Sequence, residues 1–285
     1  RDPKSIVEEV NDLALKGYKE VTLLGQNVDS YLWYGGGLKK DFKNASPIQQ
    51  ATATNFAGLL AMVAEAQPRM RIRFSTSNPQ DMTEDVLHTM AKYDNICNYI
   101  HLPVQSGSTS VLKAMNRQHT REEYMALIDK VREIIPDCGI SQDMIAGFPG
   151  ETEEDHRDTL SLMEYVKYDF GFMFMYSERP GTMAARKLED DVPTEVKKRR
   201  LTEIINLQQK HSGYRTKQFV GQTVEVLIEK ESKKSDQHWS GRNPQNTVAV
   251  FPKENYQPGD LVMVRIDDCT STTLIGEAVG YSKNH

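Results

Sequence analysis

The stretch GISQDMIAGFPGETEED, residues 139–155, predicts a strand, a glycine-containing turn and the first turn of a helix. Residues 139–146 are expected to form a strand, and Gly147 and Gly150 follow where the chain must turn. Thr152 and Asp155 then have the spacing of a capping box, in which each residue satisfies a backbone N–H of the other. The stretch therefore predicts one strand–helix unit, with its helix reaching about residue 166.

The same alternation continues on both sides of this unit. Further strands are expected at 20–24, 71–77, 98–104 and 170–176, and helices at 3–16, 56–66, 83–91, 120–135 and 193–217. Strands that alternate with helices indicate an α/β fold with a parallel sheet, either a (βα) barrel or an open doubly wound sheet. The alternation begins with a helix, although a (βα) barrel begins with a strand, and the chain begins without methionine. We therefore expect an incomplete TIM-type barrel that lacks its first strand.

Two domains are expected. Residues 1–217 form the strand–helix part, with a long loop at about 34–54 that is rich in glycine and polar residues. Residues 218–285 form the β module, with strands predicted at 223–229, 247–251, 261–266 and 272–280. Their apolar residues recur with period two, which favours a small OB-like barrel.

The charge distribution is uneven. The 285 residues carry a formal net charge of −5, which by itself argues against a nucleic-acid-binding protein. Residues 193–242, however, contain eleven Lys and Arg and only six Asp and Glu. This basic block suggests contact with a polyanion, although a solvated helix face and hairpin would produce the same count.

The composition also predicts whether the chain holds a metal site and where in the cell the protein lies. The three cysteines, Cys97, Cys138 and Cys269, are far apart and form no CxxC pair, so no metal site is expected in this chain. Few cysteines fit a reducing cytosol. No stretch approaches the roughly 20 apolar residues of a membrane span, and no leader precedes the first helix. We expect a cytoplasmic protein without membrane attachment.

Polar residues follow all five predicted strands of the strand–helix part. Such residues are common in turns, so a single polar strand end would carry no information. Five of them favour a shared polar pocket, because parallel strands end at one edge of a sheet. His101 lies within a predicted strand, where a hydrogen-bonded histidine is more common than a metal ligand. No P-loop, GxGxxG or GxSxG pattern occurs.

Several motifs together resemble one family. Residues 143–151 (DMIAGFPGE) are similar to the GxIxGxxxE stretch of radical S-adenosylmethionine (SAM) enzymes, with Asp143 in place of the first glycine. Residues 23–31, 101–108 and 176–185 resemble the methylthiotransferase branch, and residues 232–235 and 241–246 resemble a TRAM domain. Residues 25–28 and 179–182 look like the members that modify tRNA.

The resemblance implies an enzyme that inserts a methylthio group at C2 of a prenylated adenosine beside the tRNA anticodon. Its cofactors would be SAM and two [4Fe–4S] clusters. In the family the cluster cysteines lie upstream of the position of Arg1, so we expect neither cluster in this chain and no activity from it alone. The implied partners are the tRNA anticodon stem-loop, the N-terminal segment of the same protein and an electron donor. A monomer is expected.

The resemblance also suggests roles for individual residues. Eleven residues at or near the strand ends are candidate SAM contacts: Gly25, Gln26, Asn27, Ser75, Ser77, Gln105, Ser106, Asp143, Gly147, Phe148 and Arg179. Four basic residues of the β module are candidate tRNA phosphate contacts: Lys230, Lys233, Lys234 and Arg242.

Three other functions remain as alternatives. A methylthiotransferase acting on an aspartate of a ribosomal protein would share the fold and cofactors. A non-catalytic RNA-binding fragment fits the missing cluster cysteines. An aldolase-type barrel ranks last, because no lysine falls on a predicted strand end.

Overall fold

The computed structural model describes residues 1–75 and 77–285. Its strand–helix part contains two parallel sheets, β1-β4 and β5-β6-β7. A parallel bridge between Ile72 and Ile96 connects them into one open, curved layer. The five strands are β1 (Glu20–Leu23), β4 (Arg71–Phe74), β5 (Tyr99–His101), β6 (Gly139–Ala146) and β7 (Phe170–Met175). The predicted α/β class and incomplete barrel are confirmed.

Six longer helices accompany these strands, as the sequence predicts. They are α1 (Pro3–Leu15), α3 (Phe56–Ala66), α4 (Glu84–Lys92), α6 (Arg121–Ile134), α7 (Glu153–Val166) and α9 (Thr194–Lys217). Both predicted capping boxes form, Thr120 with Glu123 and Thr152 with Asp155. Apolar residues of the helices and strands share one large core in which Leu60, Ile72 and Ile140 are fully buried.

The expected loop at 34–54 is wrong in part, because the segment contains local structure. β2 (Leu32–Trp33) pairs with β3 (Thr54–Asn55) and closes the segment at its base. Between them lie η2 (Lys39–Asn44) and α2 (Pro47–Ala51). Ser46 and Gln49 form a capping box at the start of α2. Three further short elements were not predicted: η1 (Val28–Ser30), α5 (Thr109–Ala114) and α8 (Met183–Lys187).

The β module is a closed barrel with the strand order β10-β12-β11-β8-β9. Its strands are β8 (Thr223–Ser232), β9 (Ser235–Arg242), β10 (Val248–Pro252), β11 (Leu261–Cys269) and β12 (Thr273–Tyr281). The sequence does not indicate β9, because this strand is mostly polar and lacks apolar alternation. Fully buried residues such as Phe251, Val262 and Leu274 form a separate core inside the barrel.

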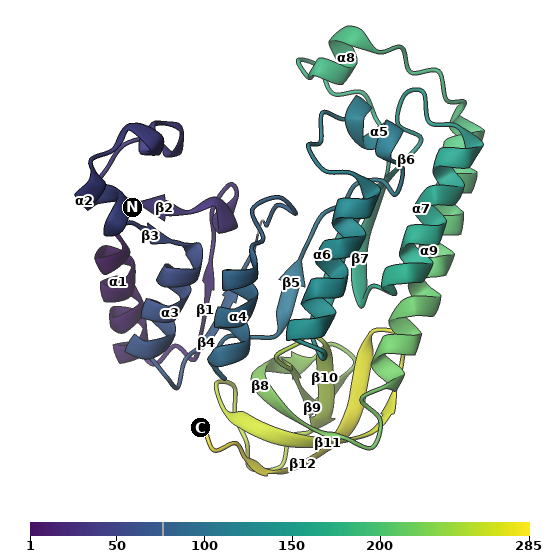
Figure 1. The fold of residues 1–285 in the computed structure, drawn as a ribbon. Helices are drawn as coiled ribbons and strands as arrows, with labels where there is room; N and C mark the ends of the chain where they lie inside the picture. Colours follow the sequence, from purple (N-terminus) through teal and green to yellow (C-terminus); the bar gives the residue numbers. More distant parts are fainter. Residues whose placement is uncertain (76) are drawn as a thin grey trace.

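The β module lies against the amino ends of the parallel strands. Arg71 and Arg73, at the start of β4, donate hydrogen bonds to the carbonyl oxygens of Arg242, Asn243 and Pro244. Arg71 also forms an ion pair with Glu225, with 3.1 Å between Nη2 and Oε1. Figure 1 shows the β module at the lower end of the molecule, with α9 running down one side to reach it. The carboxyl ends of the strands point away from the module.

Candidate functional site

Gln105 and Asp143 lie together at the carboxyl side of β5 and β6. Gln105 adopts the left-handed region, with φ of 75°, and its N–H donates to the carbonyl oxygen of Asp143 at 2.9 Å. Its own carbonyl accepts from the N–H of Ile145 at 2.9 Å. The unusual backbone therefore extends the pairing with β6 beyond the end of β5. Two of the predicted SAM contacts are adjacent as a result.

Ser106, the next residue, faces α7. Its side chain is fully buried, its hydroxyl accepts from the N–H of Ser108, and it lies 3.4 Å from the hydroxyl of Thr159 in α7. The contacts of this hydroxyl hold the loop against α7, away from the open edge of the sheet. The structure therefore turns the hydroxyl of Ser106 away from the other predicted SAM contacts and toward α7.

The turn after β6 is fixed mainly by α9. Gly147 has φ of 77°, and a Cβ atom there would come within 2.2 Å of Cγ of Lys197, so close packing alone requires glycine. Glu151 accepts from the N–H of Gly147 at 3.0 Å and pairs with Arg200 at 2.9 Å. Burial raises the pKa of Glu151, although the Gly147 N–H and Arg200 oppose this effect. Its structural role was not predicted.

Phe148 forms the side of this turn. Its ring is buried and meets the ring of Tyr176 edge to face, with 5.2 Å between the ring centroids. Lys197 extends over the Tyr176 ring at 5.1 Å and donates to both carboxylate oxygens of Asp190 at 2.6 Å. Phe148 can therefore offer little more than one ring edge to a ligand. Arg179, after β7, is exposed, and its carbonyl accepts from the hydroxyl of Thr182.

The predicted contacts from β1 and β4 form a second group at the same edge. The amide of Asn27 donates to Asp81 at 2.6 Å, and its Oδ1 is buried without a partner among the described residues. The buried hydroxyl of Ser77 likewise has no partner there. Ser75 donates its N–H to the carbonyl oxygen of Leu23, which places it beside β1. Gly25 and Gln26 are exposed directly after β1.

A buried carboxylate supports this second group. Asp29 accepts from the N–H of Asn78 at 3.0 and 3.1 Å, and burial raises its pKa to about 7. The neighbouring Asp81 raises the same pKa further, and Lys39 lowers it. Lys39 comes from the 34–54 segment and donates to Asp81 at 2.8 Å. Sequence alone gave no signal for Asp29, because its burial depends on contacts 49 residues away.

Polar side chains of β5 and β6 face the open interior of the curved sheet. The hydroxyl of Ser141 lies 2.6 Å from the Tyr99 hydroxyl and 2.7 Å from Nδ1 of His101. Nε2 of His101 lies 3.5 Å from Oδ1 of Asp143, whose side chain is 26% exposed. The prediction of a hydrogen-bonded histidine is confirmed. The link from His101 to Asp143 was not predicted.

The cysteines do not provide a cluster site. Cys97 and Cys138 are buried, and burial raises the pKa of both thiols, whereas an iron–sulfur cluster needs thiolates. Among the described residues, no group of three or more His, Cys, Asp or Glu side chains is arranged to hold a metal ion. The described residues therefore do not offer the set of thiolate ligands that a [4Fe–4S] cluster needs. In the same described part of the chain, no helix is both long and apolar enough to cross a membrane.

The predicted tRNA contacts do not form one patch. Lys233 and Lys234 are exposed in the tight turn between β8 and β9, and Lys230 is exposed nearby on β8. Arg242 ends β9, about 23 Å along the strand from its start at Ser235. There its Nη1 donates to the carbonyl oxygen of Asn246 at 2.8 Å. Arg242 thus belongs to the side of the β module that faces the parallel strands.

Comparisons with known proteins agree with this architecture. Residues 217–279 match the TRAM domain. The chain is 76% identical over 285 residues to a Christiangramia forsetii protein named tRNA-2-methylthio-N(6)-dimethylallyladenosine synthase, covering all of this chain and 59% of that protein. It is 69% identical over 283 residues to a Flavobacterium psychrophilum protein of the same name, covering 99% of this chain and 59% of that protein. The chain thus spans about three fifths of the length of these relatives.

A second family match concerns the strand–helix part itself. Residues 1–163 match the model of the radical SAM superfamily, from α1 to most of α7. This match includes the strand ends at which Asn27, Ser77 and Gln105 lie, and it covers more than half of the chain. On that ground, the chain belongs to the radical SAM superfamily.

Proposed function

We propose that this chain is part of a cytoplasmic enzyme that adds a methylthio group to C2 of N6-dimethylallyladenosine in tRNA. The observation that carries the proposal is the 76% identity to the Christiangramia forsetii protein of that name, which extends over all 285 residues. It includes both the polar edge of the sheet and the β module. The sequence motifs at residues 25–28 and 179–182 point to the same substrate.

The polar edge offers a suitable site for SAM. Buried polar atoms without a partner among the described residues, such as Oδ1 of Asn27 and Oγ of Ser77, can form hydrogen bonds with a polar ligand. When bound, SAM supplies the 5′-deoxyadenosyl carbon that removes hydrogen in this superfamily. Ten residues remain as proposed contacts: Gly25, Gln26, Asn27, Ser75, Ser77, Gln105, Asp143, Gly147, Phe148 and Arg179.

Different groups among these residues would contact different parts of SAM. The group after β1 and β4 offers amide and hydroxyl groups suited to the amino-acid end of SAM. Asp143 offers a partly exposed carboxylate, which accepts hydrogen bonds from ribose hydroxyls well. His101 restrains that carboxylate from the interior side, and Ser141 in turn restrains His101. A nucleoside held at Asp143 is thereby fixed relative to the barrel interior, as positioned chemistry requires.

The iron–sulfur clusters of the family require ligands that the three cysteines of this chain do not provide. We propose that the cluster ligands belong to another part of the same protein. RNA binding is assigned to the β module, where Lys230, Lys233 and Lys234 form an exposed basic hairpin suited to phosphate contacts.

The first test is mass spectrometry of tRNA nucleosides from cells with and without the gene. Loss of the methylthio mark, with accumulation of the prenylated precursor, is the expected result. An unchanged nucleoside profile would contradict the tRNA substrate. It would favour the alternative in which a ribosomal protein is modified.

A second test addresses the SAM contacts. In the reconstituted full-length enzyme, Gln105→Ala and Asp143→Ala should each weaken SAM binding, because each removes a polar side chain at the carboxyl side of β5 and β6. Ser106→Ala is the matched control, since this neighbouring side chain is buried against α7. Unchanged SAM affinity in both test variants would remove these two residues from the site.

A further inference from the structure

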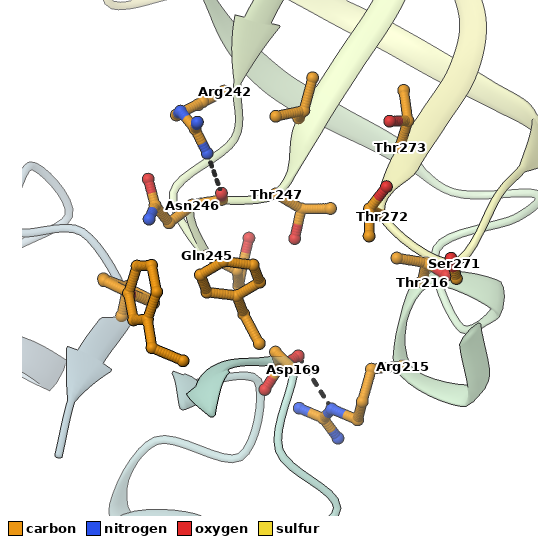
Figure 2. A pocket seen from close by; sticks show the side chains of 14 residues that line it. Asp169, Arg215, Thr216, Arg242, Gln245, Asn246, Thr247, Ser271, Thr272 and Thr273 are labelled. Atoms are coloured by element: carbon orange, nitrogen blue, oxygen red, sulfur yellow. Dashed lines mark hydrogen bonds and ion pairs between the residues drawn. The ribbon is translucent and has the colours of Figure 1, made fainter. Parts of the chain in front are cut away.

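A cavity of about 380 Å³ lies between the β module and the amino ends of the parallel strands. Figure 2 shows Arg242, Thr247, Thr272 and Thr273 on the side of the β module and Asp169 and Arg215 opposite them. The volume is within the range of ligand pockets, roughly 300–1000 Å³. None of the residues assigned above to SAM lines this cavity, because SAM is placed at the carboxyl ends of the strands.

The two arginines of the cavity differ in how strongly they are engaged. Nε of Arg215 donates to Asp169 at 2.9 Å, and Nη2 donates to the carbonyl oxygen of Cys138 at 3.4 Å. Arg242 donates from Nη1 to Asn246, and its Nε lies 3.6 Å from Glu229. Within the described residues, Nη2 of Arg242 has no assigned partner, and the side chain is 39% exposed. Arg242 can therefore receive an anionic oxygen.

Hydroxyl groups line the same side of the cavity. Thr272 and Thr273 donate their N–H groups to the hydroxyl of Thr270, which shapes the turn between β11 and β12. No hydrogen bond to another described residue is assigned to the hydroxyls of Thr247, Thr272 or Thr273. Figure 2 shows these three side chains at the cavity. Together with Arg242 they offer the mixture of charge and hydroxyl donors that binds phosphate oxygens.

The opposite wall is aromatic. Gly171 of β7 faces Gln142 and Gln208, so its neighbours Phe170 and Phe172 face the open interior instead. Their side chains are 44% and 49% exposed, and their rings meet edge to face with 5.0 Å between centroids. Exposed rings beside phosphate-binding groups are typical of surfaces on which nucleic-acid bases stack.

We propose that this cavity binds one nucleotide of the RNA substrate, with its phosphate at Arg242 and the threonine hydroxyls and its base against Phe170. The inference rests on the proposed function and adds a second RNA contact to the Lys233–Lys234 hairpin. The geometry also gives the subsite a direction. The ring of Phe172 lies 6.1 Å from that of His101, which reaches Asp143 in the barrel interior. A strand held in the cavity would continue toward the SAM site.

The test measures binding of a fluorescent anticodon stem-loop RNA to the full-length protein at several salt concentrations. Phe170→Leu should weaken binding about tenfold, because it keeps an apolar side chain but loses the stacking face. Phe170→Trp should retain the RNA affinity of the wild type, because it keeps a stacking face. Arg242→Gln should weaken binding and reduce the salt slope by about 1, whereas Arg242→Lys should keep the slope.

Arg265→Gln is the matched control, because Arg265 is an exposed arginine of the same barrel that pairs with Asp267 and Glu277. Its RNA affinity should equal that of the wild type. Thermal melting verifies that each variant is folded. Wild-type affinity in both Phe170→Leu and Arg242→Gln would overturn the subsite while leaving the proposed function intact. Absence of RNA binding by the wild type would overturn both.

Discussion

The β module and the strand–helix part complete their sheets in different ways. In the β module each strand pairs on both sides, so the barrel is closed and its core is sealed. In the strand–helix part, β1 and β7 each pair with one described neighbour, and the interior stays open. Phe170, Phe172 and Phe174 are therefore exposed on β7. A closed barrel keeps its inner face for its own core, whereas an open sheet can present its inner face to a ligand.

Replacing one phenylalanine in each region should give the largest difference in the free energy of unfolding. Phe251→Ala removes a fully buried ring from the β module, so it should destabilise the protein by roughly 3–5 kcal/mol. Phe174→Ala removes an exposed ring and should change stability by less than about 0.5 kcal/mol. Denaturant unfolding measures both changes.

The chain offers a separate reporter for each region. Its two tryptophans are Trp33, in β2, and Trp239, in β9. Variants that retain only one of them would follow the unfolding of each region by fluorescence. Equal losses from the two phenylalanine substitutions would contradict the contrast between a closed and an open core.

Removing the contact between the two regions should have the next largest effect on stability. Arg73 is buried, pairs with Glu20 at 2.9 Å and donates to the carbonyl oxygens of Asn243 and Pro244. Arg73→Ala leaves these acceptors without their donor and should destabilise the protein by about 3 kcal/mol. It should also separate the unfolding transitions of Trp33 and Trp239. Arg69→Ala, an exposed neighbour, serves as the control, and a single shared transition in Arg73→Ala would count against this coupling.

The pH dependence of stability should differ between the regions because of Asp29. Burial raises its pKa to about 7, so the fold favours the protonated form. This contribution is complete below the unfolded pKa near 4 and is lost as the pH rises through about 7. Asp29→Asn should therefore be more stabilising at pH 8 than at pH 5, by about 2 kcal/mol. Urea unfolding at both pH values, with the exposed Asp12→Asn as control, measures the difference, and an equal effect at both would contradict it.

Much of the fold follows from local sequence signals. Capping boxes at Thr120 and Thr152 set the starts of α6 and α7, and an apolar run sets α3, because these signals act within one turn of helix. β9 escapes such reasoning, since its residues are mostly polar and lack the apolar alternation of a half-buried strand. α2 and α5 are too short for a clear period. Their existence depends on the surrounding packing.

The sequence predicts that the polar strand ends share one edge of the sheet, because parallel strands end together. It does not predict the direction of their side chains. Side-chain direction depends on the backbone, and no local pattern places Gln105 in the left-handed region or turns Ser106 toward α7. The glycine at 147 reflects contact with Lys197, a residue 50 positions later in the sequence, and no local pattern contains that information.

The smallest expected effect on stability belongs to the exposed hairpin of the β module. Lys233 and Lys234 are exposed in the turn between β8 and β9, so their double replacement by alanine should alter stability by less than about 0.5 kcal/mol. It should nevertheless reduce the salt slope of RNA binding by about 2, because each lysine would neutralise one phosphate. An unaltered slope would remove the hairpin from the RNA-binding surface. The RNA contacts would then be confined to the cavity between the two regions, which Arg242 and Phe170 line.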